Sequence, residues 1–226
     1  MSTSIRRPLW LIHPSAFLLT AQLLLLLLYS VFDGLYIERA LIGVFGLVVV
    51  VLRVWVIDRS PGVNWIAWTL AIPAFTLSLL SAFSINSNLL VWSSLLDAAL
   101  YFYAAASLIA SMMKDYQVTI DELFSAGATF TLLAWGFAYL YLICQTQMPG
   151  SFVITTNSSQ SLTFVELLFL SFTNLSSAGL SDILPVTTFA RVLLMLEQFI
   201  GVGYIAVVIS RLVGLTIYRQ SESRRE

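Results

Sequence analysis

The chain has 226 residues, of which 59% are hydrophobic and 10% are charged, and its formal net charge is −1. This composition excludes a soluble domain and indicates an integral membrane protein surrounded by lipids, with no nucleic-acid partner expected. The single cysteine, Cys144, excludes an internal disulfide framework, and the single histidine, His13, excludes the His/Cys clusters of zinc and non-haem iron sites. We therefore expect no cofactor, no metal beyond permeant ions and no enzyme activity.

Six hydrophobic windows are long enough to span a bilayer. They lie at Ser15–Phe32, Ala40–Ile57, Val63–Phe83, Leu89–Met113, Leu123–Cys144 and Phe189–Ile217. An even number of spans places both termini on one side of the membrane. Lys and Arg residues gather at the window ends on that side, which predicts cytoplasmic termini in a multi-pass protein of the plasma (inner) membrane.

The fourth window, Leu89–Met113, contains no arginine, although a voltage sensor needs several at helical spacing. It contains one acid, Asp97, which is either functional or a protonated or Tyr101-bonded side chain that faces other helices, and we assign it no role. After this window, Lys114-Asp115 and Asp121-Glu122 flank an amphipathic linker between the first four windows and the last two. This linker is either an element that transmits motion or a solvated charged turn, and the turn is the more economical interpretation.

The apolar run Phe164–Leu175 is too short to span. At about 1.5 Å per residue it extends roughly 18 Å, against a hydrocarbon core of about 30 Å. It is followed by the small, polar stretch Ser176–Asp182. Irregular backbone at membrane depth is tolerated only where it is buried in protein or lines a watery cavity, so the pattern predicts a half-membrane helix and a pore loop that re-enters from outside.

The segment Phe169–Asp182 resembles the pore of tetrameric potassium channels, in which a short helix leads into a motif of the type T-x-T-T-V-G-Y-G-D. The downstream stretch Ile200–Gly214 is similar to the inner helix of bacterial members of that family. The resemblance implies a homotetramer around a central pore and an outer-mouth acid at Asp182. It also implies an ion filter formed by Ser176, Ser177, Ala178, Gly179, Leu180 and Ser181.

The loop departs from the family motif at two positions. Leu180 stands in place of the tyrosine and Ser181 in place of the second glycine, whereas Gly179 and Asp182 match. A serine in the left-handed conformation costs about 1–2 kcal/mol, so we expect the loop to follow a different backbone path. Potassium selectivity of the family type cannot be assumed for this loop.

Four further residues are candidates near the loop. Gly201 and Gly203 are either an inner-helix hinge or sites of close helix packing. Glu166 lies in the first turn of the half-helix, where the helix dipole stabilises an acid. Glu197 lies about two turns inside the last helix and is costly unless paired or buried. We regard both acids as candidates for filter support, with helix capping sufficient to explain Glu166.

These features together predict an all-α membrane protein with six spanning helices plus a re-entrant helix and filter loop. The expected regions are a cytoplasmic segment (1–14), a peripheral four-helix domain without voltage-sensor arginines (15–117), a pore domain (118–217) and a cytoplasmic tail (218–226). The predicted function is passive conduction of small monovalent cations, potassium or sodium. The alternatives are a non-selective or anion channel and a non-conducting regulatory or structural subunit.

Overall fold

The computed structural model of the chain describes residues 14–32, parts of 69–80, 87–114, 120–154 and 161–223. These residues form five helices and two short strands, apart from the helical pieces within 69–80. The elements are α2 (Pro14–Phe32), α5 (Ser87–Lys114), α6 (Ile120–Gln147), β1 (Phe152–Ile154), α7 (Phe164–Leu175), β2 (Ile183–Pro185) and α8 (Thr188–Ser223).

Three of the described helices, α5, α6 and α8, are long and apolar enough to cross a membrane. They coincide with the fourth, fifth and sixth predicted windows, and α2 coincides with the first. The window Ala40–Ile57 and most of Val63–Phe83 lie outside the described residues. The predicted helix Phe164–Leu175 is confirmed at both ends.

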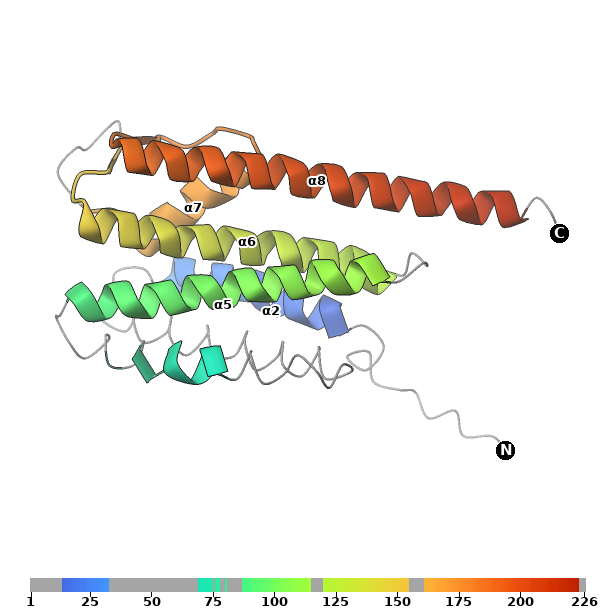
Figure 1. Cartoon of the computed structure of the whole chain (residues 1–226), viewed down its shortest axis with the longest axis horizontal. Helices are drawn as coiled ribbons and strands as arrows, with labels where there is room; N and C mark the ends of the chain where they lie inside the picture. Colours follow the sequence, from blue (N-terminus) through green and yellow to red (C-terminus); the bar gives the residue numbers. More distant parts are fainter. Residues whose placement is uncertain are drawn as a thin grey trace.

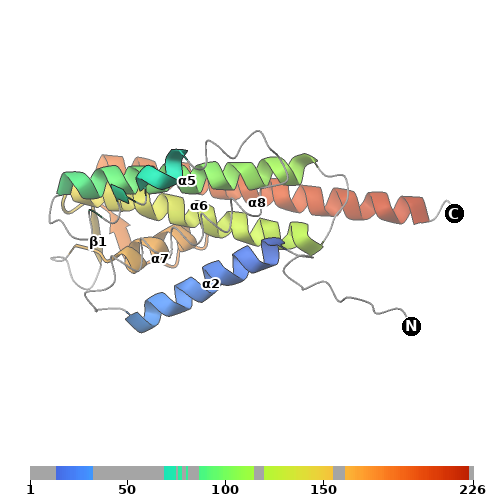
Figure 2. The same ribbon diagram turned by 90° about the horizontal axis from the view of Figure 1, so that it is seen from below.

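The long helices lie side by side with alternating direction, and α6 is at the centre (Figure 1). In the most apolar part of α6, 72% of the residues are buried inside the protein, against 39% for α5 and 17% for α8. α2 packs on another face of α6 and crosses that helix at an angle (Figure 2). The core is therefore built around α6, while α8 leaves most of its surface uncovered.

α7 starts at the end of the bundle where α6 finishes and reaches only partway along it (Figure 1). The chain then turns back to the same end, where α8 begins. β1 and β2 pair antiparallel at this end, with Val153 opposite Leu184. The all-helical expectation missed this small ladder, which joins the segment before α7 to the segment before α8.

Aromatic side chains fix α7 on α6. The ring of Phe164 lies 4.9 Å from that of Tyr139 and 5.7 Å from that of Trp135, measured between ring centroids. Near the other end of α7, Phe172 meets Phe130 edge-on at 5.9 Å. Such aromatic pairs combine a large buried area with preferred geometry, so they hold the short helix at two points along its length.

The charged residues at the start of α6 are tied to other helices, which corrects the expectation of a solvated turn. The Asp121 carboxylate accepts bonds from the backbone N–H of Ser15 (3.1 Å) and from its hydroxyl (2.9 Å), and so caps the positive end of α2. Glu122 is 6% exposed and accepts from Nε of Arg211 at 2.6 Å. Tertiary packing thus gives both acids a partner in another helix, and it buries Glu122.

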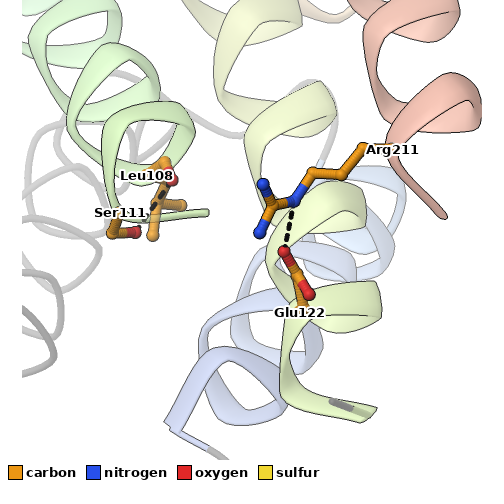
Figure 3. Close-up of polar contacts among 4 residues, drawn as sticks. All are labelled: Leu108, Ser111, Glu122 and Arg211. Atoms are coloured by element: carbon orange, nitrogen blue, oxygen red, sulfur yellow. Dashed lines mark hydrogen bonds and ion pairs between the residues drawn. The ribbon is translucent and has the colours of Figure 1, made fainter. Parts of the chain in front are cut away.

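The Glu122–Arg211 pair joins the start of α6 to the C-terminal half of α8, and Figure 3 shows the guanidinium directed at the carboxylate. The side chains are 5% and 13% exposed, so the pair is largely shielded from solvent. In the same view Ser111 bonds back to the Leu108 carbonyl of its own helix at 2.8 Å. The ion pair is therefore a link between helices, unlike that local contact.

Candidate functional site

The candidate site comprises α7, the loop from Ser176 to Asp182 and the face of α8 that packs on them. α7 begins with a capping box: the backbone N–H of Glu166 donates to the Thr163 hydroxyl at 3.3 Å, and the N–H of Thr163 donates to the Glu166 carboxylate at 2.6 Å. The expected capping role of Glu166 is thereby confirmed. The box defines where the short helix starts.

The C-terminal end of α7 closes in a Schellman motif. The Ser177 N–H donates to the Asn174 carbonyl at 2.9 Å, and the Ala178 N–H donates to the Thr173 carbonyl at 2.9 Å. Ser177 has a φ of 56°, the left-handed conformation that glycine usually supplies at this position. The second residue of the loop is therefore a serine in a strained conformation.

The loop follows a tight path around the end of α7. Gly179, with a φ of 62°, donates to the Thr173 carbonyl at 3.2 Å, so that oxygen accepts from two successive loop residues. Among the described residues Ser177 is the non-glycine residue with positive φ, and Ser181 keeps a negative φ while its hydroxyl accepts from the Ile183 N–H at 3.1 Å. The cost of a left-handed serine therefore arises at Ser177 and not at Ser181.

The loop residues lie open on the surface of the single chain. The five residues from Ser176 to Leu180 and Asp182 are exposed, and Leu180 reaches 78% exposure. Ser181 is intermediate. The loop is therefore uncovered in the single chain.

Glu197 reaches from α8 into a polar cluster behind α7. It is fully buried and hydrogen-bonds with the Tyr141 hydroxyl of α6 and the Ser171 hydroxyl of α7. Its Oε2 also accepts from Nδ2 of Asn174 at 2.7 Å. One carboxyl group therefore joins α6, α7 and α8 directly behind the helix that leads into the loop.

Two further bonds extend this cluster. Nδ2 of Asn174 donates to the Leu194 carbonyl of α8 at 3.1 Å, and the Ser171 hydroxyl lies 2.8 Å from the Ala134 carbonyl of α6. Sequence reasoning identified Glu197 but missed Ser171, Asn174 and Tyr141. The available signal was the pair Ser171 and Asn174, polar residues three apart on a short apolar helix, which share one helix face.

Gly201 lies one helical turn beyond Glu197 on the same face of α8. A Cβ at this position would stand 2.1 Å from the carbonyl oxygen of Leu175, the last residue of α7, so only glycine permits the contact. A Cβ at Gly203 would have no atom within 4 Å. The structure therefore gives Gly201 a packing role and leaves Gly203 open.

The outward face of α8 is apolar and uncovered. Phe199 is 79% exposed, Met195 59% and Val202 55%. Ala190, Leu193, Glu197 and Gly201 recur at intervals of three or four residues on the opposite, buried face. The helix is thus divided lengthwise between a face that holds α6 and α7 and a face directed away from the chain.

Asp97 lies half-buried on α5, which packs along α6. Arg191, near the start of α8, donates through Nε to the Pro185 carbonyl of β2 at 3.2 Å. Among the described residues no group of three or more His, Cys, Asp or Glu side chains is arranged to hold a metal ion.

Comparison with known proteins locates a family in this part of the chain. No curated protein and no solved structure matches the chain. Residues 127–217 match the sequence model of a protein family described as "Ion channel", and the matched segment includes most of α6, all of α7 and the loop, and α8 as far as Ile217. Together with the three described helices that are long and apolar enough to cross a membrane, this match supports an integral membrane protein in which α6, α7 and α8 form the segment similar to that family.

Proposed function

We propose that the chain is the pore-forming subunit of a homotetrameric, potassium-channel-like channel that passes small monovalent cations passively. The observation that carries the proposal is the order of elements: a membrane-length helix, a 12-residue helix that stops partway, a tight polar loop and a second membrane-length helix. Residues 118–217 are its pore domain and residues 15–117 its peripheral domain. Both termini are cytoplasmic, in the plasma (inner) membrane.

The charge distribution of α7 favours cations over anions. Its C-terminal end at Leu175 leads directly into the loop, and a helix C-terminus carries a partial negative charge of about half a unit. Asp182 adds a full negative charge at the exposed end of the loop. In a fourfold arrangement these charges would concentrate cations at the mouth, and the backbone carbonyls from Ser176 to Ser181 would supply oxygen ligands.

The surface of α8 supports assembly of several copies. One chain supplies one loop, and a central filter needs about four of them. The exposed apolar face with Phe199, Met195 and Val202 is suited to neighbouring subunits and to lipid tails. Because the loop is also uncovered in the single chain, the same assembly would enclose it.

The selectivity of the proposed pore depends on the sequence of the loop. Leu180 and Ser181 replace residues on which the potassium-channel motif depends, and the left-handed positions in this loop are Ser177 and Gly179. We propose a monovalent cation pathway that discriminates weakly between potassium and sodium. Voltage dependence should be weak, because the fourth predicted window contains no arginine.

The test is reconstitution of the purified chain into planar bilayers with asymmetric potassium, sodium and chloride salts. The expected result is a single-channel current whose reversal potential follows the cation gradients. A reversal potential that follows chloride would contradict the cation proposal and favour an anion channel. Silence in all three salts, with a tetramer seen by native mass spectrometry, would favour a non-conducting subunit.

A matched pair of glycine variants separates an effect on the loop from general strain. Gly179 and Gly150 both have positive φ, 62° and 82°, and a Cβ at either would have no atom within 4 Å. Gly179→Ala and Gly150→Ala therefore impose similar backbone strain. Only Gly179→Ala should change conductance, and an equal change in both variants would argue against ion passage along the loop.

A further inference from the structure

The hydrogen-bond geometry around Glu197 determines where its protons lie. The Ser171 hydroxyl has one hydrogen and two acceptor oxygens within bonding distance, the Ala134 carbonyl at 2.8 Å and Oε1 of Glu197. If Glu197 were a carboxylate, one of these two oxygen contacts would have no hydrogen between its atoms. A buried contact of that kind is unfavourable.

A protonated carboxyl group gives each hydrogen bond of Glu197 a donor and an acceptor. The Oε1–H group donates to Ser171, and the Ser171 hydroxyl then donates to the Ala134 carbonyl. Oε2, a carbonyl oxygen with two lone pairs, accepts from the Tyr141 hydroxyl and from Nδ2 of Asn174 at 2.7 Å. The remaining Nδ2 hydrogen of Asn174 reaches the Leu194 carbonyl at 3.1 Å.

The electrostatic surroundings of Glu197 agree with the neutral form. In the described part of the chain, Arg211 pairs with Glu122 and Arg191 donates to the Pro185 carbonyl, so each of these arginines has a partner other than Glu197. The group is fully buried, and it lies beside Asn174 in the last turn of α7, where the helix dipole is negative. An uncompensated buried carboxylate there would be costly.

We propose that Glu197 is a neutral, hydrogen-donating acid that positions α7, and through it the loop, rather than a fixed charge of the ion pathway. This inference deepens the proposed function and rests on it only for the effect on conduction. The groups that face Glu197 are Tyr141 from α6 and Ser171 and Asn174 from α7. The negative charge that attracts cations then comes from Asp182 and the end of α7.

Replacement by glutamine distinguishes the neutral from the charged form. Glu197→Gln keeps the size of the side chain, and its amide can donate to Ser171 while its carbonyl accepts from Tyr141 and Asn174. It should keep the melting temperature within about 3 °C of the wild type and leave the current unchanged. Glu197→Ala should lower the melting temperature by roughly 6–12 °C, because the buried donors of Tyr141 and Asn174 lose their acceptor and a cavity is left.

The decisive measurement is the infrared spectrum of the detergent-purified chain at neutral pH, which needs no conduction. The wild type minus Glu197→Gln difference should contain the carbonyl stretch of a protonated carboxyl group. Glu166→Gln, which alters the capping acid of the same helix, should remove a carboxylate band instead. A carboxylate band in the Glu197→Gln difference would overturn the inference.

The two proposals fail separately. A protonated band together with a silent bilayer would refute channel function and leave the neutral Glu197 intact. If the protein conducts, and Glu197→Gln strongly alters the current but leaves the melting temperature unchanged, the positioning role is refuted. Loss of current in Glu197→Ala with recovery in Glu197→Gln is the expected pattern.

Discussion

The α-carbon of Gly201 in α8 lies against the carbonyl of Leu175, where α7 ends, so closely that a Cβ would stand 2.1 Å from the oxygen. This contact and the Glu197 cluster one turn earlier bring the same face of α8 against the last turn of α7. The position of the loop therefore depends on a close approach between backbones. Such a contact tolerates no added methyl group without a shift of one helix.

Gly201→Ala should accordingly separate α7 from α8. Its neighbour is backbone rather than a flexible side chain, so we expect a loss of stability near the upper end of the about 1–3 kcal/mol typical of overpacking. Thermal unfolding in detergent measures it. Gly203→Ala is the control, since its Cβ meets no atom within 4 Å and alanine favours the helix by up to about 1 kcal/mol. Equal destabilisation by both changes would contradict the packing role.

The same control variant also addresses a hinge at Gly203. If α8 bends there during opening, Gly203→Ala should raise thermal stability and lower the open probability of the channel. An unchanged open probability would leave Gly203 with no part in gating.

Ser177→Gly should stabilise the protein. Ser177 has a φ of 56° at the position after the C-cap, and a non-glycine residue in that region costs about 1–2 kcal/mol. Glycine removes this strain, at the cost of a more flexible unfolded chain, so we expect a net gain of up to about 1 kcal/mol. Ser176→Gly, at a φ of −77°, is the control and should give no gain. A lower melting temperature for Ser177→Gly would show that its hydroxyl matters more than its backbone.

The Glu122–Arg211 pair should couple the C-terminal half of α8 to α6. Removal of one partner from a largely buried pair is strongly destabilising, here by about 2–4 kcal/mol for Glu122→Gln or Arg211→Gln. The double variant should cost less than the sum of the single variants. A double-mutant cycle on unfolding free energy measures the coupling, for which we expect about 1–3 kcal/mol. Strictly additive costs would mean that each side chain is held mainly by other contacts.

Asp182→Asn should weaken cation conduction in a salt-dependent manner. The carboxylate is exposed, so its field extends over about 30 Å at 10 mM salt but only about 3 Å at 1 M. Single-channel current should therefore fall at low salt and approach the wild-type value at 1 M. Asp182→Glu keeps the charge and should behave as the wild type. A reduction independent of salt would indicate a structural effect on the loop instead.

The sequence by itself determined the features that depend on length and local pattern. Phe164–Leu175 is too short to cross the bilayer, whereas the windows on either side of it are long enough. The capping acid Glu166 lies three residues after Thr163. All of these distances can be counted along the chain. The resemblance of the loop and α8 to a channel pore likewise depends on residues that are adjacent in the sequence, and the family match covers the same segment.

Only the tertiary structure decided which distant residues meet. Glu197 bonds Tyr141, 56 residues away, and Ser171, 26 residues away, while Glu122 finds Arg211 at a separation of 89. The spacing of residues along a helix gives the face on which each lies but not the helix that it will face. The strained serine also proved to be Ser177, because the loop path is set by how α7 ends and how closely Gly201 lets α8 approach.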